Sequence, residues 1–343
     1  MPKPSSIRRY RTIDAHAAGE PLRLIIEGYP APKGRTMLEK RAWVKRHADA
    51  IRRALMLEPR GHADMYGAVL TEPVTAEADA GVLFMHNEGY STMCGHGIVA
   101  VTTIAIERGL IHPKVPNQIV FDSPAGPVHA RAHAGVREAA GGPGVCVDRV
   151  AFDNVPSFVF APGLPIQAGS REIRADVAFG GAFYAIVDAE AAGLPLTPAR
   201  LPELRRLGME IKHAVEAAIT VVHPLDKGLS GIYGTIFTGP PERGDADLKN
   251  VTIFADAEVD RSPCGTGTCA VMAVIDAMGL MPPGRPFGHE SLIGTLFKGR
   301  MTGRTRVADF DAILPELEGS AWITGEHVFL VDDEDPLKGG FRL

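Results

Sequence analysis

Two cysteines in matching glycine-rich surroundings are the residues of this 343-residue chain best suited to chemistry. They lie in Met93-Cys94-Gly95-His96-Gly97 and in Pro263-Cys264-Gly265-Thr266-Gly267, which share the pattern Cys-Gly-x-Gly. Each cysteine follows the end of a strand-like run by ten residues, and each motif opens an apolar run that is compatible with a helix. The two cysteines are 170 residues apart (264 − 94), which predicts two similar halves that each supply one thiol.

The predicted position of these thiols, at a helix N-terminus, favours proton transfer. Unpaired backbone N–H groups and the helix dipole stabilise a thiolate there and lower the pKa of the cysteine. The flanking glycines allow the backbone to approach a ligand, and the free N–H groups can hold a small carboxylate. Two thiols on opposite sides of one carbon could remove an α-proton from one face and return a proton to the other. A cleft that excludes water and N–H donors that stabilise an enolate-like transition state would complete such a site.

Other interpretations of these residues stay open. Free cysteines are often buried and inert, and this is our interpretation of Cys146 in a strand-like run and Cys269 in an apolar helix. A zinc site could use Cys94, His96 and further histidines, although the sequence has no Cys-x-x-Cys or His-x-x-x-His spacing. A papain-type Cys–His hydrolase would leave the second Cys-Gly-x-Gly motif unexplained. A binding protein without turnover is the remaining alternative.

Composition limits the partners and the compartment. The chain has 36 Lys and Arg against 41 Asp and Glu, a net charge of −5, and 6% aromatic residues, so nucleic-acid binding is not expected. No run approaches the roughly 18 apolar residues of a membrane span, and the N-terminal stretch lacks the apolar segment of a signal peptide. We therefore expect a cytoplasmic protein, with no membrane association, whose cysteines are free thiols.

The pattern of short apolar runs predicts an α+β protein with mixed sheets. Helical periodicity covers residues 37–57 and 202–217, and a helix is expected after each cysteine motif. Runs rich in β-branched residues between turn signals predict strands at 22–26, 80–85, 118–121, 145–152, 158–160 and 251–254.

The two cysteine motifs, with Asp260-Arg261-Ser262 before the second, resemble the proline racemase family. Its members include proline racemases, 4-hydroxyproline 2-epimerases and trans-3-hydroxy-L-proline dehydratases. The resemblance covers nearly the whole chain and includes residues 14–16, 58–62, 154–156, 180–184, 289–294 and 335–338. It implies two similar α/β halves, each a mixed sheet wrapped around a central helix as in diaminopimelate epimerase-like folds, with the active site in the cleft between them. We expect the first half, with Cys94, to span residues 1–128 plus 318–343, and the second half, with Cys264, to span 129–317.

The resemblance also implies roles for individual residues. Cys94 and Cys264 match the two catalytic thiols, and the family uses neither a metal nor a pyridoxal cofactor. The resemblance further implies closure of the cleft on a small-molecule substrate, proline or hydroxyproline, and a homodimer. The positions that match substrate-binding residues are Gly95, His96, Gly265 and Thr266, whose N–H groups would hold the carboxylate, and His223 and Asp260, which would contact the amine or ring.

The motifs indicate two different members of the family. Residues 61–67 and 86–91 resemble the dehydratase branch, but dehydratases of that branch typically carry Thr where this chain has Cys264. Residues 289–294 are more similar to the racemases and epimerases. Because inversion needs a proton donor on the second face, we expect a two-thiol racemase or 2-epimerase of proline or hydroxyproline. The alternatives are a trans-3-hydroxy-L-proline dehydratase that gives pyrroline-2-carboxylate and an enzyme with both activities.

Overall fold

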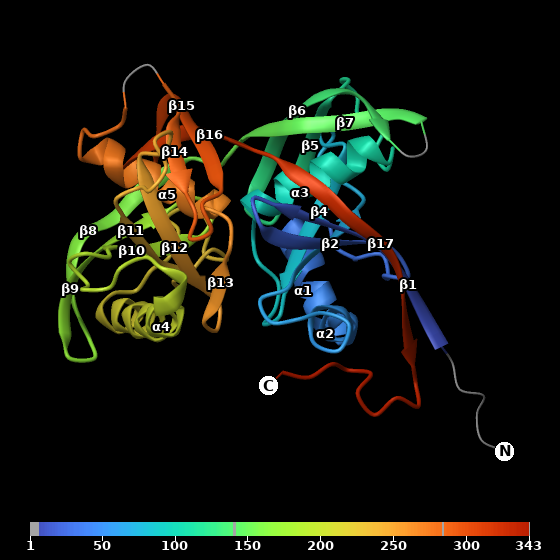
Figure 1. Cartoon of the computed structure of the whole chain (residues 1–343), viewed down its shortest axis with the longest axis horizontal. Coiled ribbons are helices and arrows are strands. Elements are labelled where there is room, and N and C mark those ends of the chain that lie inside the picture. Colours follow the sequence, from blue (N-terminus) through green and yellow to red (C-terminus); the bar gives the residue numbers. More distant parts are fainter. Residues whose placement is uncertain (1–6, 140–141, 283–284, 343) are drawn as a thin grey trace.

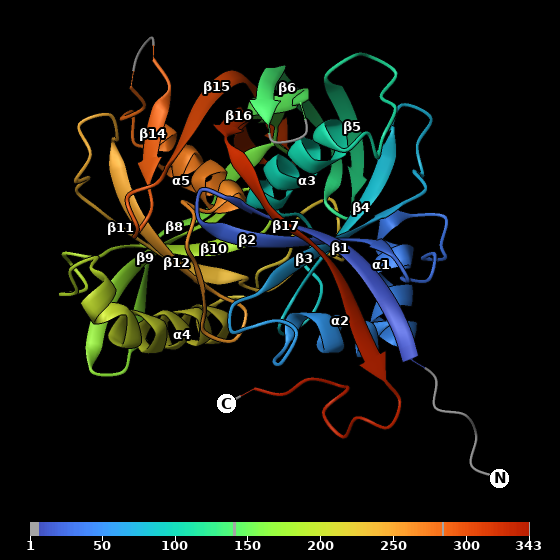
Figure 2. The same ribbon diagram turned by 45° about the vertical axis from the view of Figure 1, so that its right-hand side comes forward.

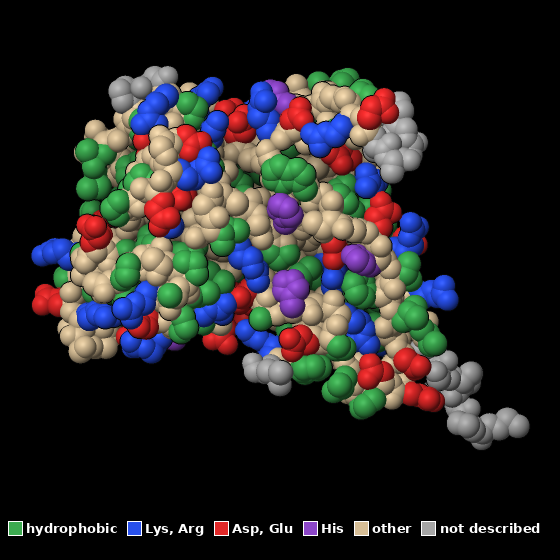
Figure 3. Space-filling view, in the orientation of Figure 1, with side chains coloured by type: hydrophobic (Ala, Val, Ile, Leu, Met, Phe, Trp, Pro, Cys, Tyr) green, Lys and Arg blue, Asp and Glu red, His purple; other side chains and the backbone are tan. Residues whose placement is uncertain are grey.

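The computed structural model describes residues 7–139, 142–282 and 285–342. The N-terminal residues on which the expectation about a signal peptide partly rests lie outside this range. Within it, none of the helices combines the length and the apolar character that crossing a bilayer requires. On the face drawn in Figure 3, Lys and Arg side chains are interspersed with Asp and Glu rather than gathered into one field.

Eight strands form the part of the sheet that surrounds the first cysteine motif. They are hydrogen-bonded in the order β17–β1–β2–β3–β4–β5–β6–β7, with parallel pairing for β2–β3 and β4–β5 and antiparallel pairing elsewhere. Figure 2 shows β17 beside β1 and β2. The strands are β1 (Ile7–Ala17), β2 (Glu20–Glu27), β3 (Tyr66–Thr71), β4 (Ala80–His86), β5 (Gln118–Ser123), β6 (Gly126–Ala139), β7 (Gly142–Asp153) and β17 (Ala321–Asp332).

The strands around the second cysteine motif close on themselves like a barrel. Their order is β8–β9–β10–β11–β12–β14–β15–β16, and β16 pairs again with β8. Because β16 also pairs with β7, both groups belong to one seventeen-stranded network of parallel and antiparallel pairs, which confirms the predicted mixed sheet. The strands are β8 (Ser157–Ala168), β9 (Arg171–Phe179), β10 (Phe183–Asp188), β11 (Gly234–Gly239), β12 (Leu248–Phe254), the short β13 (Glu258–Asp260) beside β12, β14 (Phe287–Glu290), β15 (Leu296–Val307) and β16 (Phe310–Gly319).

Two buried helices begin at the cysteine motifs. Helix α3 (Gly95–Glu107) contacts β1, β6, β7 and β17, and helix α5 (Gly265–Ala277) contacts β8, β9, β15 and β16. In Figure 1 they lie among the two groups of strands. Every residue of α3 up to Ala105 and of α5 up to Val274 is buried, as expected for helices that are apolar on all sides.

The remaining helices lie outside these groups of strands and differ slightly from the sequence prediction. The predicted helix 37–57 is two helices, α1 (Met37–His47) and α2 (Asp49–Met56), which meet at Ala48. The helix predicted at 202–217 is α4 (Leu201–Ala218), preceded by the 3-10 turn η1 (Pro198–Arg200). Helices α1 and α2 contact β4, while α4 contacts β8, β11 and β12.

The N-termini of α3 and α5 meet backbone to backbone at two glycines. A Cβ atom added to Gly95 would lie 2.5 Å from Cα of Gly265, and one added to Gly265 would lie 2.4 Å from Cα of Gly95. Such distances are shorter than real Cβ contacts, so both positions require glycine for close approach. This contact places Cys94 and Cys264, each one residue before its glycine, next to each other.

We expect Gly95→Ala and Gly265→Ala to force the two helix ends apart. Overpacking at this backbone contact should lower the free energy of unfolding by about 1–3 kcal/mol, and misplacement of the thiols should remove activity. Thermal unfolding and turnover measure the two effects. Gly244→Ala is the control, because its added Cβ would meet no atom within 4 Å. A Gly95→Ala protein with unchanged melting temperature and rate would show that the contact is not required.

Candidate active site

Cys94 is the N-cap residue of α3, and its sulfur lies among hydrogen-bond donors. Its Sγ accepts the backbone N–H of Gly97 at 3.2 Å, and Nδ1 of His96 lies 3.3 Å from the same sulfur. A Cβ at Gly97 would stand 2.8 Å from this Sγ, so the second glycine of the motif leaves the sulfur its space. The Gly97 N–H at the helix N-terminus therefore acts to stabilise a thiolate at Cys94.

Cys264 is the N-cap residue of α5 and has a strained backbone. Its φ of 63° and ψ of 110° lie outside the regions that a residue with a Cβ prefers, at a cost of about 1–3 kcal/mol. A Cβ at Gly267 would lie 2.9 Å from Sγ of Cys264, which repeats the arrangement of the first motif. Oη of Tyr184 is 3.6 Å from the same sulfur. Strain of this kind concentrates at active sites, where the surrounding structure holds a residue in place.

Both thiols line one small cavity of about 20 Å³, whose walls consist almost entirely of buried residues. This volume accommodates about one water molecule, so a proline-sized substrate reaches the thiols only when the walls separate. The walls combine apolar surface with phenol, thiol and carboxyl groups. They are formed by Tyr66, Met93, Cys94, Gly95, His96, Tyr184, Tyr233, Phe254, Asp260, Cys264, Gly265 and Thr266.

Burial dominates the electrostatics of the two thiols. It raises the pKa of Cys94, while the Gly97 N–H lowers this pKa and the Asp260 carboxylate raises it further. Burial and the charge of Asp260 likewise raise the pKa of Cys264, and the Tyr184 hydroxyl acts in the opposite direction. The lowering expected from the helix N-terminus is thus one contribution, and in this small cavity burial outweighs it. A thiolate here depends on the donors placed around it.

His96 is neutral in this environment. Burial lowers its pKa to about 3, and the charge of Arg261 adds to this effect, while a hydrogen bond with the backbone of Pro21 opposes it. A papain-type hydrolase keeps a protonated histidine beside its thiolate, and the burial of His96 disfavours that charged form. Among the described residues, no three His, Cys, Asp or Glu side chains are grouped so that they could hold a metal ion.

Asp260 organises the loop that leads to Cys264. Its Oδ1 accepts the backbone N–H of Ser262 at 2.9 Å and the hydroxyl of Ser262 at 2.7 Å. The Ser262 Oγ in turn accepts the backbone N–H of Cys264 at 3.1 Å. Burial raises the pKa of Asp260 to about 6, although the two bonds from Ser262 lower it. Asp260 therefore positions the second thiol and also presents a carboxyl group to the cavity.

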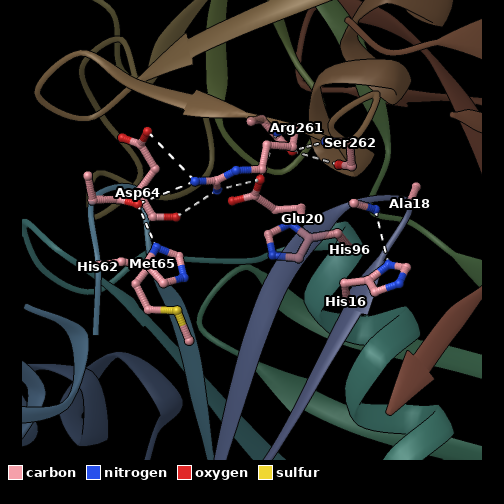
Figure 4. Close-up of polar contacts among 12 residues, drawn as sticks. His16, Ala18, Glu20, His62, Asp64, Met65, His96, Arg261 and Ser262 are labelled. Atoms are coloured by element: carbon pink, nitrogen blue, oxygen red, sulfur yellow. Dashed lines mark hydrogen bonds and ion pairs between the residues drawn. The ribbon is translucent and has the colours of Figure 1, made fainter. Parts of the chain in front are cut away.

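Polar contacts beside the cavity join the two groups of strands (Figure 4). The backbone N–H of Arg261 donates to Oε2 of Glu20 at 2.7 Å, and the Arg261 guanidinium donates to the backbone oxygen of Asp64 at 3.1 Å. Arg205 forms an ion pair with the Asp64 carboxylate. Because Glu20 and Asp64 lie on the Cys94 side and both arginines on the Cys264 side, these contacts hold the two sides of the cavity together.

The structure brings together all the predicted site residues except one. Gly95, His96, Asp260, Gly265 and Thr266 line the cavity with the two thiols. His223 lies outside these walls and packs against the rings of Phe158, Phe179 and Phe183. Its Nδ1 accepts the backbone N–H of Leu225 at 3.3 Å, and burial lowers its pKa. The structure therefore does not bring His223 into the cavity walls, and its role as a substrate contact stays a prediction.

Comparison with known proteins agrees with this geometry. Residues 12–342 match the proline racemase family. The chain belongs to this family. The resemblance drawn from the cysteine motifs is thereby confirmed, and so is the prediction of an enzyme of the racemase and epimerase class with dehydratases as the alternative.

Relatives within the proline racemase family carry two activities. The chain is 49% identical over 335 residues to a trans-3-hydroxy-L-proline dehydratase of Bacillus cereus, a match that covers 97% of this chain and 98% of the relative. It is 43% identical over 336 residues to a 3-hydroxyproline 2-epimerase of Burkholderia multivorans, with the same coverage. A solved hydroxyproline epimerase of Agrobacterium vitis, with bound trans-4-OH-L-proline, superposes with a TM-score of 0.88 at 32% identity, covering 99% of this chain and 96% of that one.

Three tyrosines of this family member were not predicted as site residues. The chain has six tyrosines, and Tyr66, Tyr184 and Tyr233 all line the cavity that holds the thiols. They lie far from both cysteine motifs in the sequence, so spacing alone gives no reason to select them. Residues 180–184 and 61–67 belong to the stretches that resemble the family, and this was the signal that could have singled out Tyr184 and Tyr66.

We expect Asp260→Asn to lower the pKa of both thiols. The substitution removes a negative charge that disfavours the thiolates and keeps the Oδ1 acceptor for Ser262. The pH profile of alkylation by iodoacetamide should therefore move to lower pH by roughly one unit or more. Asp309→Asn, at an exposed turn, is the control. An unchanged alkylation profile in Asp260→Asn would contradict the electrostatic role.

Proposed function

We propose that this protein removes the Cα proton of 3-hydroxyproline with a cysteine thiolate and without a cofactor. The observation that carries the proposal is the pair of thiols, each at the N-terminus of a buried helix, in the walls of one cavity. Membership of the proline racemase family supports the Cα chemistry. The substrate is proposed because the relatives from Bacillus cereus and Burkholderia multivorans both carry 3-hydroxyproline in their names.

Two thiols support 2-epimerisation of this substrate. One thiolate takes the Cα proton, and the other thiol protonates the opposite face of the planar intermediate. The first N–H groups of α3 and α5, at Gly95, His96, Gly265 and Thr266, would hold the substrate carboxylate, because such groups have no partner within a helix. The Asp260 carboxylate, which is ionised above about pH 6, would hold the ring ammonium.

Dehydration of trans-3-hydroxy-L-proline is the second candidate reaction. It is favoured by relatives in Bacillus cereus and Burkholderia cenocepacia, which are named for this activity and are 49% and 44% identical to the chain. The same Cα carbanion serves both reactions, since it either takes up a proton on the other face or expels the 3-hydroxyl group. An enzyme with both activities is therefore part of the proposal.

We propose that the substrate enters as two halves of the chain separate. A neighbouring cavity of about 460 Å³ shares Tyr233 with the one that holds the thiols. Its lining has three basic residues, Arg41, Lys45 and Lys212, against the two acidic residues Glu88 and Asp256, and this excess of positive charge would attract an amino-acid carboxylate. Residues of β6 and β7 belong to the hydrophobic core around α3, which favours a boundary between the two halves near residue 153 rather than residue 128.

A homodimer and a cytoplasmic location stay predictions. Light scattering tests the first and cell fractionation tests the second.

Proton NMR in D₂O tests the proposed function. Trans-3-hydroxy-L-proline, trans-4-hydroxy-L-proline and L-proline are supplied in separate tubes, and the L-proline tube is also followed by optical rotation. We expect the 3-hydroxy compound to lose its Cα proton signal and to give cis-3-hydroxy-D-proline, pyrroline-2-carboxylate or both. Turnover confined to one of the other two tubes would overturn the proposed substrate, and an inert protein would overturn the proposed chemistry.

Alanine variants of the two cysteines separate the two reactions. Cys94→Ala should abolish both, because no base remains on its side, whereas Cys264→Ala should abolish epimerisation and keep dehydration. The same NMR assay measures both products. Cys146→Ala is the control, since this cysteine lies in β7 outside the cavity. Epimerisation that survives in Cys264→Ala would exclude the two-thiol mechanism.

A further inference from the structure

Each thiol has its own phenol on the same side of the cavity. Tyr66, at the start of β3, and Cys94 belong to one group of strands, whereas Tyr184 in β10 and Cys264 belong to the other. The Tyr66 hydroxyl donates to Oγ of Ser91 at 2.6 Å, and Oη of Tyr184 lies 2.6 Å from Oγ1 of Thr266. A hydroxyl group next to each phenol thus fixes its position beside the thiol.

The first of these thiol and phenol pairs is the better placed to hold a thiolate. The sulfur of Cys94 accepts the Gly97 N–H and lies 3.3 Å from Nδ1 of His96. The His96 ring packs edge to face against Tyr66, with ring centroids 4.8 Å apart, which places this phenol beside the first thiol. Cys264 makes no side-chain capping bond to α5, and Tyr184 is 3.6 Å from its sulfur. Cys94 is therefore the base that the structure favours for the first proton transfer.

The stereochemistry of the substrate decides where an acid must lie. In trans-3-hydroxy-L-proline the hydroxyl group is trans to the carboxylate, so it is on the same face of the ring as the Cα proton. The base that removes this proton and the acid that protonates the departing hydroxyl consequently approach from one side. Cys264 and Tyr184 belong to the other group of strands, whereas Tyr66 comes from the same group as Cys94 and packs against His96, the neighbour of that thiol.

We propose that Tyr66 is the general acid that protonates the 3-hydroxyl group as it leaves, an inference that rests on the proposed dehydration. The Cys94 thiolate takes the Cα proton, the C2–C3 double bond forms, and the C3–O bond breaks. The Tyr66 hydroxyl transfers its proton to the leaving oxygen, which departs as water. The Tyr66 phenolate then takes the proton from the Cys94 thiol, which restores both groups. The enamine product tautomerises to pyrroline-2-carboxylate, and the second thiol takes no part.

The surroundings of Tyr66 suit a transient phenolate. Burial raises the pKa of Tyr66, so its hydroxyl stays neutral and can donate a proton. The hydroxide that leaves C3 is more basic than a phenolate, so the proton transfer to it is favourable. Oη of Tyr233 lies 3.3 Å from Oη of Tyr66. The Tyr233 and Ser91 hydroxyls can both turn to donate to a phenolate at Tyr66, since hydroxyl protons rotate freely.

A leaving group that needs no acid tests this role. Tyr66→Phe is compared with the wild type on trans-3-hydroxy-L-proline, followed by pyrroline-2-carboxylate, and on trans-3-fluoro-L-proline, followed by a fluoride electrode. We expect dehydration to fall by about 10²–10⁴-fold, the usual effect of losing a general acid, while fluoride release stays within about tenfold of the wild type. Fluoride leaves without protonation, so only an acid role predicts this difference between the substrates.

Controls separate the possible failures. Tyr10→Phe changes a buried tyrosine outside the cavity and should leave both rates unchanged. If Tyr66→Phe lowers the rates on both substrates equally, or lowers neither rate, Tyr66 is not the acid. If Tyr184→Phe shows the selective loss instead, the acid lies on the Cys264 side and the proposal is overturned. A wild-type protein that forms no pyrroline-2-carboxylate overturns the proposed dehydration itself, before any variant is compared.

Discussion

The backbone contact between Gly95 and Gly265 is the constraint on which the site depends. Two helices can present their N-termini to one small volume only if their first turns approach more closely than any side chain would allow. Once they do, the residue before each glycine lies at the edge of that volume, and in both motifs this residue is a cysteine. The second glycines, Gly97 and Gly267, leave space for the two sulfur atoms.

The same close packing makes it harder to form a thiolate in the site. A small buried cavity excludes water, which suits proton transfer at a weakly acidic carbon, but burial raises the pKa of both thiols. The helix N–H groups oppose this effect at short range, and neutral phenols supply further donors without adding charge. Asp260 acts against the thiolates through its own charge while it holds the loop of Cys264 in place. The pKa of each thiol thus depends on the balance between burial and the charge of Asp260, which raise it, and the N–H and phenol donors, which lower it.

The contacts that join the two sides beside the cavity are polar. The bonds from Arg261 to Glu20 and Asp64, and the ion pair of Arg205 with Asp64, join the two sides next to the cavity. The continuous link between the sides is the pairing of β7 with β16. In the entry route that we propose, these polar contacts would break while the strand pairing keeps the sheet connected.

Much of the chemistry could be predicted from the sequence, because the residues that carry it lie in short motifs. The repeated Cys-Gly-x-Gly pattern determined the two thiols, the helices that begin there and the family. The predicted helix at 37–57 was wrong in its continuity, since the break at Ala48 carries no proline or glycine signal. Only the tertiary structure decided that His223 lies against three phenylalanine rings and that Tyr66, Tyr184 and Tyr233 surround the thiols. These side chains come from strands and loops far apart in the sequence, and their contacts depend on how the sheet closes, which no local spacing encodes.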